Sequence, residues 1–169
     1  MKAKRNNPPG DTFWVVYDRE SKHKYADVLH AETRSIADSH DINIALSNVC
    51  FEVWLLLHFE NGIGPFENFD DLWHRSPLKK HLPHYQKGDH SLYPKLKNGL
   101  ASARENAESL NKRTRDGSDP RERFPHQWNP YTDIHKLLSA IDQFADSGKK
   151  MGEYRTGRFA GKENLKRPD

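Results

Sequence analysis

The sequence has a single cysteine, Cys50, so no disulfide bond can form within the chain. A reducing compartment is the natural expectation for such a protein. The sequence also lacks an apolar run long enough to cross a bilayer. Its first residues carry charge with no apolar segment after them, which does not match a signal peptide. We therefore expect a cytoplasmic protein with no membrane contact.

Several common catalytic patterns are absent as well. The sequence contains no P-loop, no dinucleotide-binding fingerprint and no pattern typical of a Ser-His-Asp triad. His81, His84 and His90 resemble zinc-ligand spacing only loosely, and no cysteine pair accompanies them. These absences turn attention from nucleotide-cofactor, serine-hydrolase and zinc chemistry to the carboxylates.

The charge of the chain is unevenly distributed. The 169 residues carry a net charge of +3, and residues 147–169 contain seven Lys or Arg against three acids. We expect one domain over residues 11–146, followed by a basic, disordered tail over residues 147–169. Such a tail is either a solvated chain end or a contact for nucleic-acid phosphates.

The apolar pattern predicts alternating strands and helices. Short apolar runs predict strands over residues 11–18 and 42–46, and helical periodicity follows each of them. Ser47 and Asn48 stand where a helix N-cap is expected. This order predicts an α/β fold with a parallel sheet core and flanking helices. The predicted helices cover residues 24–40, 49–59, 66–73, 95–113 and 132–148, the last with Thr132 as N-cap and Gly148 at its end.

Three carboxylates follow the two predicted strands. Asp18 and Glu20 come after the first strand, and Glu52 comes shortly after the second. Because parallel strands end at the same edge of a sheet, these side chains are expected to face one crevice, where Mg²⁺ or Mn²⁺ would offset their repulsion. Ser47 and Asn48 would then lie close enough to contact a substrate. The alternative is structural, with a surface turn after the first strand and Glu52 simply favoured by the helix dipole.

Four segments resemble the RloB-like family. "SNVCFEVWLLLHFE" at residues 47–60 resembles the long signature of that family, although Val49 stands where the family prefers proline. "VVYDRE" at residues 15–20 is similar to its acidic strand, and "YQK" at residues 85–87 to a Tyr-x-Lys element. "NPYTDIHKLL" at residues 129–138 resembles its closing segment. The order and spacing agree over residues 12–145.

The resemblance implies a Toprim-like fold and a Mg²⁺-dependent nuclease of prokaryotic anti-phage defence, acting by abortive infection on DNA or RNA. An ATPase of the same defence locus is the implied protein partner. By position, Asp18, Glu20 and Glu52 would be the catalytic metal ligands. Lys87 would contribute to catalysis and, with Asn48, to phosphate contact.

Two departures from the family keep alternatives open. Glu20 replaces the second aspartate, and only residues 1–10 precede the acidic strand, where the family has a further strand and a glutamate loop. The alternatives are a chain inactivated by truncation, a non-catalytic nucleic-acid or protein-binding module of a defence complex, and a fragment without a role of its own. The resemblance also makes His58 a weaker candidate for positioning or phosphate contact. Because His58 follows Glu52 by six residues and points in a different direction on a helix, we expect it in the core or supporting the site from outside the metal ligands.

Overall fold

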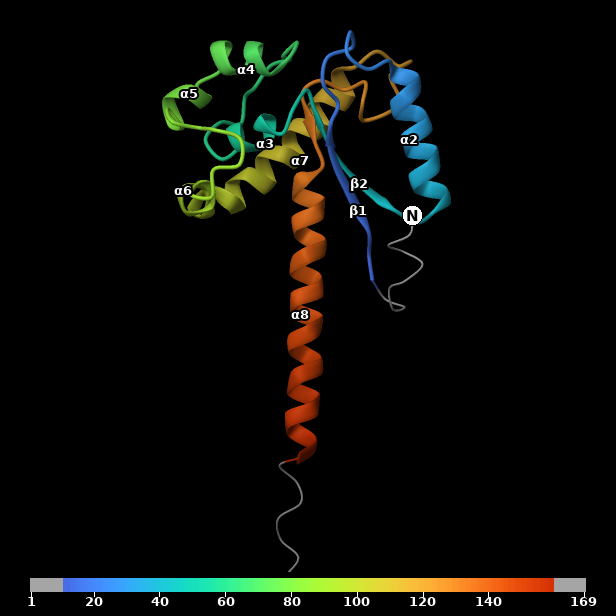
Figure 1. The fold of residues 1–169 in the computed structure, drawn as a ribbon, viewed down its shortest axis with the longest axis vertical. Helices are drawn as coiled ribbons and strands as arrows, with labels where there is room; N and C mark the ends of the chain where they lie inside the picture. The colour runs from blue at the N-terminus through green and yellow to red at the C-terminus, as the bar shows by residue number, and fades with distance from the viewer. Residues whose placement is uncertain (1–10, 160–169) are drawn as a thin grey trace, which may run out of the picture. The chain divides into compact units, whose positions relative to one another are not determined.

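The computed structural model describes residues 11–159, with side chains described up to residue 146. Contacts divide the chain into two compact units, residues 1–135 and 136–169, and each is described by itself. The first unit combines a small sheet with several helices, which confirms the expected α/β class (Figure 1). None of the helices in the described part of the chain combines the length and apolar character that a bilayer crossing needs.

The first two strands form the predicted parallel pair. β1 (Trp14–Asp18) and β2 (Asn43–Asn48) are joined through α2 (Asp27–Ser39), which contacts β2. The register sets Asp18 opposite Ser47. The last residue of β1 therefore lies at the carboxyl edge of the sheet, next to the segment that leads out of β2 (Figure 1).

The third strand was not predicted. β3 (Tyr131–Thr132) pairs with the end of β2 in antiparallel direction, so within the described residues the sheet is mixed rather than wholly parallel. Two residues carry too little periodicity to be recognised in a sequence. The Asn111 side chain fixes this strand, since its amide donates to the Thr132 carbonyl at 2.8 Å and accepts from the Thr132 backbone N–H at 3.1 Å.

Short helices follow β2, and the first of them, α3, packs against the longer helix α7. The core lies where α3 meets α7, because Val53 and Leu56 are fully buried and Ala103 and Ala107 let the two helices approach closely. α3 is shorter than the predicted helix over residues 49–59. The helices of this part are α3 (Glu52–Leu56), α4 (Phe69–Arg75), α5 (Leu78–His81), α6 (Leu92–Leu96) and α7 (Leu100–Gly117), with a 3₁₀ turn (Lys97–Gly99) before α7.

Ser47 and Asn48 do not cap a helix, contrary to the prediction. Both residues belong to β2, and both are buried. The Ser47 hydroxyl hydrogen-bonds the Thr132 hydroxyl at 3.0 Å. The Asn48 amide donates to the carbonyls of His126 and Trp128 at 3.0 and 2.7 Å. These distant partners use the polar groups that would otherwise satisfy a helix N-terminus, so the strand continues through both residues.

The last helix extends beyond its predicted end. α8 (Ile134–Phe159) passes through Gly148, which a helix interior tolerates at a modest cost. Thr132 lies in β3 rather than at the N-cap position, although its hydroxyl accepts from the Ile134 N–H at 3.3 Å. The backbone of the basic segment is thus helical up to Phe159, and residues 160–169 lie outside the described residues. Residues 1–10, expected to stand in place of a first strand, also lie outside them.

A buried arginine holds the loop that follows β1. Arg19 is 1% exposed, and its Nε donates to the His126 carbonyl at 3.0 Å. Its other nitrogens donate to the carbonyls of Ser21 and Tyr25 and to the Asp27 carboxylate. The guanidinium fork suits this role because it serves several acceptors at once.

Replacing this arginine should destabilise the fold strongly. We expect Arg19→Ala to lower the free energy of unfolding by about 3 kcal/mol, because a buried carbonyl and a carboxylate lose their donor. Arg121→Ala is the matched control, since Arg121 is 89% exposed and pairs with Asp119 on the surface. Urea unfolding monitored by tryptophan fluorescence measures both. A loss below about 1 kcal/mol for Arg19→Ala would contradict the assigned role.

Candidate active site

Two acidic side chains meet at the carboxyl edge of the sheet. Asp18 is the last residue of β1, and Glu52 is the first residue of α3, just beyond β2. Burial, and then the negative charge of Glu52, raise the pKa of Asp18 to about 6. A backbone hydrogen bond from Phe51, the residue before Glu52, to Asp18 acts in the opposite direction and lowers this pKa. Asp18 therefore lies beside the segment that carries Glu52, and their joint binding of a metal ion stays a prediction.

Glu52 is the more buried of the two carboxylates. It is 1% exposed, and its Oε1 accepts a hydrogen bond from the Tyr85 hydroxyl at 2.7 Å. The Lys87 Nζ lies 3.8 Å from the same oxygen. Its Oε2 is buried without a hydrogen-bond partner. A buried carboxylate oxygen without a partner is costly, so this position suits a bound cation.

Neighbouring groups respond to the Glu52 charge. Burial, and then a hydrogen bond to Glu52, raise the pKa of Tyr85, so this phenol stays protonated and donates. Burial, and then the charge of Glu52, raise the pKa of Cys50. The Cys50 thiol is therefore protonated near neutral pH and unsuited to nucleophilic attack.

Glu20 is not brought to the pair in the same way. Its φ is +62°, and its backbone N–H donates to the Val49 carbonyl at 2.8 Å. Its carboxylate accepts from the Lys24 ammonium at 2.9 Å, while its charge still contributes to the raised pKa of Asp18. In the part of the chain that the structure describes, no group of three or more Asp, Glu, His or Cys side chains is arranged to hold a metal ion. Glu20 as a third ligand stays a prediction.

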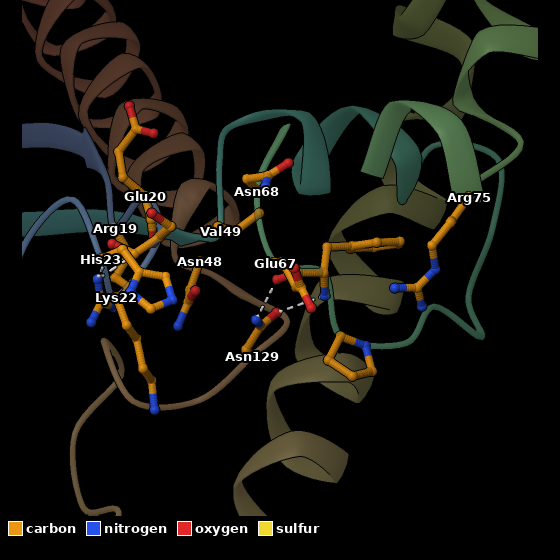
Figure 2. A pocket seen from close by; sticks show the side chains of 13 residues that line it. Arg19, Glu20, Lys22, His23, Asn48, Val49, Glu67, Asn68, Arg75 and Asn129 are labelled. Atoms are coloured by element: carbon orange, nitrogen blue, oxygen red, sulfur yellow. Dashed lines mark hydrogen bonds between the residues drawn. The ribbon is translucent and has the colours of Figure 1, made fainter. Parts of the chain in front are cut away.

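The remaining predicted residues have definite places. The side chains of Ser47 and Asn48 bond to the segment around β3, and Asn48 also lines a cavity together with the loop after β1 (Figure 2). Their contact with a substrate stays a prediction. The His58 ring bonds the Trp54 carbonyl at 3.0 Å and lies edge-on to the Trp54 ring. His58 is only partly buried, and this burial lowers its pKa.

Tyr85 was missed as a site residue. The Tyr-x-Lys element had directed attention to Lys87, although the tyrosine makes the shorter contact with Glu52. Phe69 and Trp73 of α4 also lie beside this contact, since Trp73 packs against Tyr85 and Lys87 lies over the Phe69 ring. Phe69 and Trp73 are four residues apart, a spacing that in a sequence usually indicates core packing. The sequence pattern therefore gave no sign of a role at the site.

Comparison with known proteins identifies the family. A family model described as RloB-like protein matches residues 1–141.

The chain belongs to the RloB-like protein family.

No curated protein and no solved structure gives a significant match. The match covers the whole candidate site of this RloB-like protein, including Asp18, Glu52 and Lys87.

The residues of the RloB-like site fit a divalent cation in part. Asp18 and Glu52 provide hard carboxylate oxygens, and the Oε2 atom of Glu52 is a buried acceptor without a partner. Waters and substrate phosphates normally complete such a coordination shell. Lys87 contributes a positive charge beside the other carboxylate oxygen, and Asp18 and Glu52 are the residues that would hold the cation.

The raised pKa of Asp18 predicts a pH-dependent stability. The folded pKa of about 6 lies above the ordinary value of 3.8, so the folded state binds more protons between these values. Stability must therefore fall as pH rises from about 4 to about 6, and it stays lower above that range. Asp18→Asn cannot ionise. We expect it to be more stable than the wild type by about 1 kcal/mol at pH 7.5 in EDTA, after allowance for solvent screening, and equally stable near pH 4.

The control for this measurement is Asp38→Asn. Asp38 lies on α2, is 62% exposed and pairs with Arg34 at 3.7 Å, so its replacement should change stability little at either pH. Urea unfolding at both pH values measures the difference. Equal stability of Asp18→Asn and wild type at pH 7.5 would show that the two carboxylates do not strain the fold.

Proposed function

We propose that this RloB-like protein is a Mg²⁺- or Mn²⁺-dependent phosphodiesterase of Toprim type that cleaves nucleic acid. The observation that carries the proposal is the convergence of Asp18 and Glu52 at the carboxyl edge of the sheet, with one buried oxygen of Glu52 lacking a partner. Open α/β sheets bind ligands at this edge. Family membership supports the same reading at a coarser level.

The residues of the chain have separate roles in this proposal. Asp18 and Glu52 would hold the metal ion, which when bound would polarise a phosphate oxygen and activate a water molecule. Tyr85 holds the Glu52 carboxylate in a fixed rotamer through its 2.7 Å hydrogen bond. Lys87 is 65% exposed and lies beside the carboxylate, so its ammonium can reach a phosphate oxygen of a bound strand. Abortive infection in phage defence, with an ATPase partner, belongs to this proposal through the family resemblance.

A cleavage assay tests the proposed activity. Purified wild-type protein is incubated with labelled DNA and RNA and with Mg²⁺, Mn²⁺ or EDTA. We expect metal-dependent cleavage that Asp18→Asn and Glu52→Gln each reduce at least about 100-fold, which corresponds to roughly 3 kcal/mol of lost transition-state stabilisation. Asp38→Asn should cleave as the wild type does. Absence of cleavage with either metal and either nucleic acid would refute the proposal.

A second function is favoured by the position of the lysines. Lys24 pairs with the Glu20 carboxylate, and Lys87 lies beside Glu52, so two of the three predicted ligands already have a cationic neighbour. This arrangement suits a non-catalytic module that binds nucleic acid or a partner protein. It predicts salt-sensitive binding of nucleic acid that survives Asp18→Asn and weakens when residues 147–169 are removed. Unchanged binding after that deletion would exclude a role for the basic segment.

A further inference from the structure

A cavity with the size of a small-molecule site is lined by Arg19 and Glu20, which follow Asp18 in the chain, and by Asn48 and Val49 at the end of β2. It has a volume of about 510 Å³, within the range of roughly 300–1,000 Å³ that ligand pockets span. One wall comes from the loop after β1, including Glu20, and the other from the segment of residues 65–68 (Figure 2). Asn48 and Val49 of the β2 end lie between the walls. The cavity thus begins where the acidic strand ends.

The lining combines apolar surface with basic groups at the rim. Pro65 and Phe66 supply flat apolar surface on one wall, and the Arg75 guanidinium lies 5.8 Å from the Phe66 ring centroid. Lys22 and His23 stand on the opposite wall (Figure 2). Lys22 is 65% exposed, and an acid reaches it only at 3.9 Å. Two carboxylates, Glu20 and Glu67, also line the cavity; Glu20 is paired with Lys24, and Arg75 is paired with Asp71. Apolar surface with Lys22 at the rim is complementary to a nucleobase with its phosphate.

We infer that the substrate is single-stranded nucleic acid, one nucleotide of which enters this cavity while the adjoining phosphate lies at Asp18 and Glu52. The inference rests on the proposed function and names its substrate class. A base in a duplex is stacked and paired, so it enters a pocket only after extrusion at a cost of a few kcal/mol, whereas an unpaired base avoids most of that cost. The site should therefore bind single-stranded nucleic acid in preference to a duplex.

An aromatic surface that reaches Glu52 through Tyr85 supports the same inference independently. Phe69, Trp73 and Tyr85, here called the aromatic shelf, pack in sequence with ring centroids 6.0 and 6.2 Å apart. Each of the three is only partly buried. The Lys87 ammonium lies over the Phe69 ring at 5.2 Å and near Glu52. Partly exposed rings with a cation beside them are the usual platform for stacking unpaired bases.

The decisive measurement is binding without cleavage. Asp18→Asn in EDTA is titrated against short labelled oligonucleotides of the same sequence, as single-stranded DNA, single-stranded RNA and duplex DNA, by fluorescence anisotropy. We expect both single strands, or one of them, to bind at least tenfold more tightly than the duplex. Equal or tighter binding of the duplex overturns the inference, whether or not the wild type cleaves. A single-strand preference in a protein that never cleaves would instead leave the binding site standing and refute the proposed nuclease.

Variants then locate the site. Ser21→Trp fills the cavity from its wall, and Trp73→Leu removes part of the aromatic shelf. In the Asp18→Asn background each variant should weaken single-strand binding about tenfold, the size expected for loss of one stacked base, and should leave duplex binding unchanged.

Lys22→Ala should reduce the salt dependence of binding by about one counterion, and Lys112→Ala is the control that removes the same charge elsewhere. Unaltered single-strand binding by folded Ser21→Trp and Trp73→Leu overturns the assigned site, and circular dichroism verifies folding.

Discussion

One backbone carbonyl ties the three parts of the site together. The His126 oxygen accepts from Arg19 at the end of β1 and from Asn48 at the end of β2, each at 3.0 Å. The segment that leads into β3 is thereby fastened across the carboxyl edge of the parallel pair. Because both donors are buried, water competes poorly for this acceptor. The fixed edge sets the position of Asp18 and of the turn that presents Glu52.

The carboxylates of Asp18 and Glu52 are in an unfavourable environment that the surrounding fold maintains. Glu52 is buried with one oxygen unpartnered, and its charge raises the pKa of Asp18. Such an arrangement lowers stability in the absence of a bound cation, and a rigid frame is needed to keep the side chains from moving apart. The buried contact of α3 with α7 provides that frame, since both helices pack through small or fully buried side chains. Perturbed acids in a fixed crevice are typical of functional sites.

The segment of residues 65–75 serves both sides of this crevice. Phe66 and Arg75 line the cavity, whereas Phe69 and Trp73 belong to the aromatic shelf beside Glu52. In the inferred binding mode, this segment and α4 would contact two neighbouring bases of one strand. Asn129 fastens the start of this segment through paired hydrogen bonds with the Phe66 backbone, at 3.3 and 2.6 Å (Figure 2). The two flanks of the crevice are thus held to the same framework as its acidic edge.

The sequence by itself determined the parallel pair and the position of its acids. Apolar runs bounded by polar residues mark β1 and β2, and the connection through α2 makes them parallel, so Asp18 and Glu52 had to share an edge. Only the tertiary structure decided that β2 continues through Ser47 and Asn48 and that β3 adds an antiparallel strand. It also decided the partners of the acids, since Tyr85 binds Glu52 and Glu20 pairs with Lys24. The partners of Ser47 and Asn48 lie 78 to 85 residues away, and a local pattern carries no information about contacts at such separation. Hydrogen bonds between distant residues therefore determined the end of β2 and the pairing of β3, which sequence periodicity does not predict.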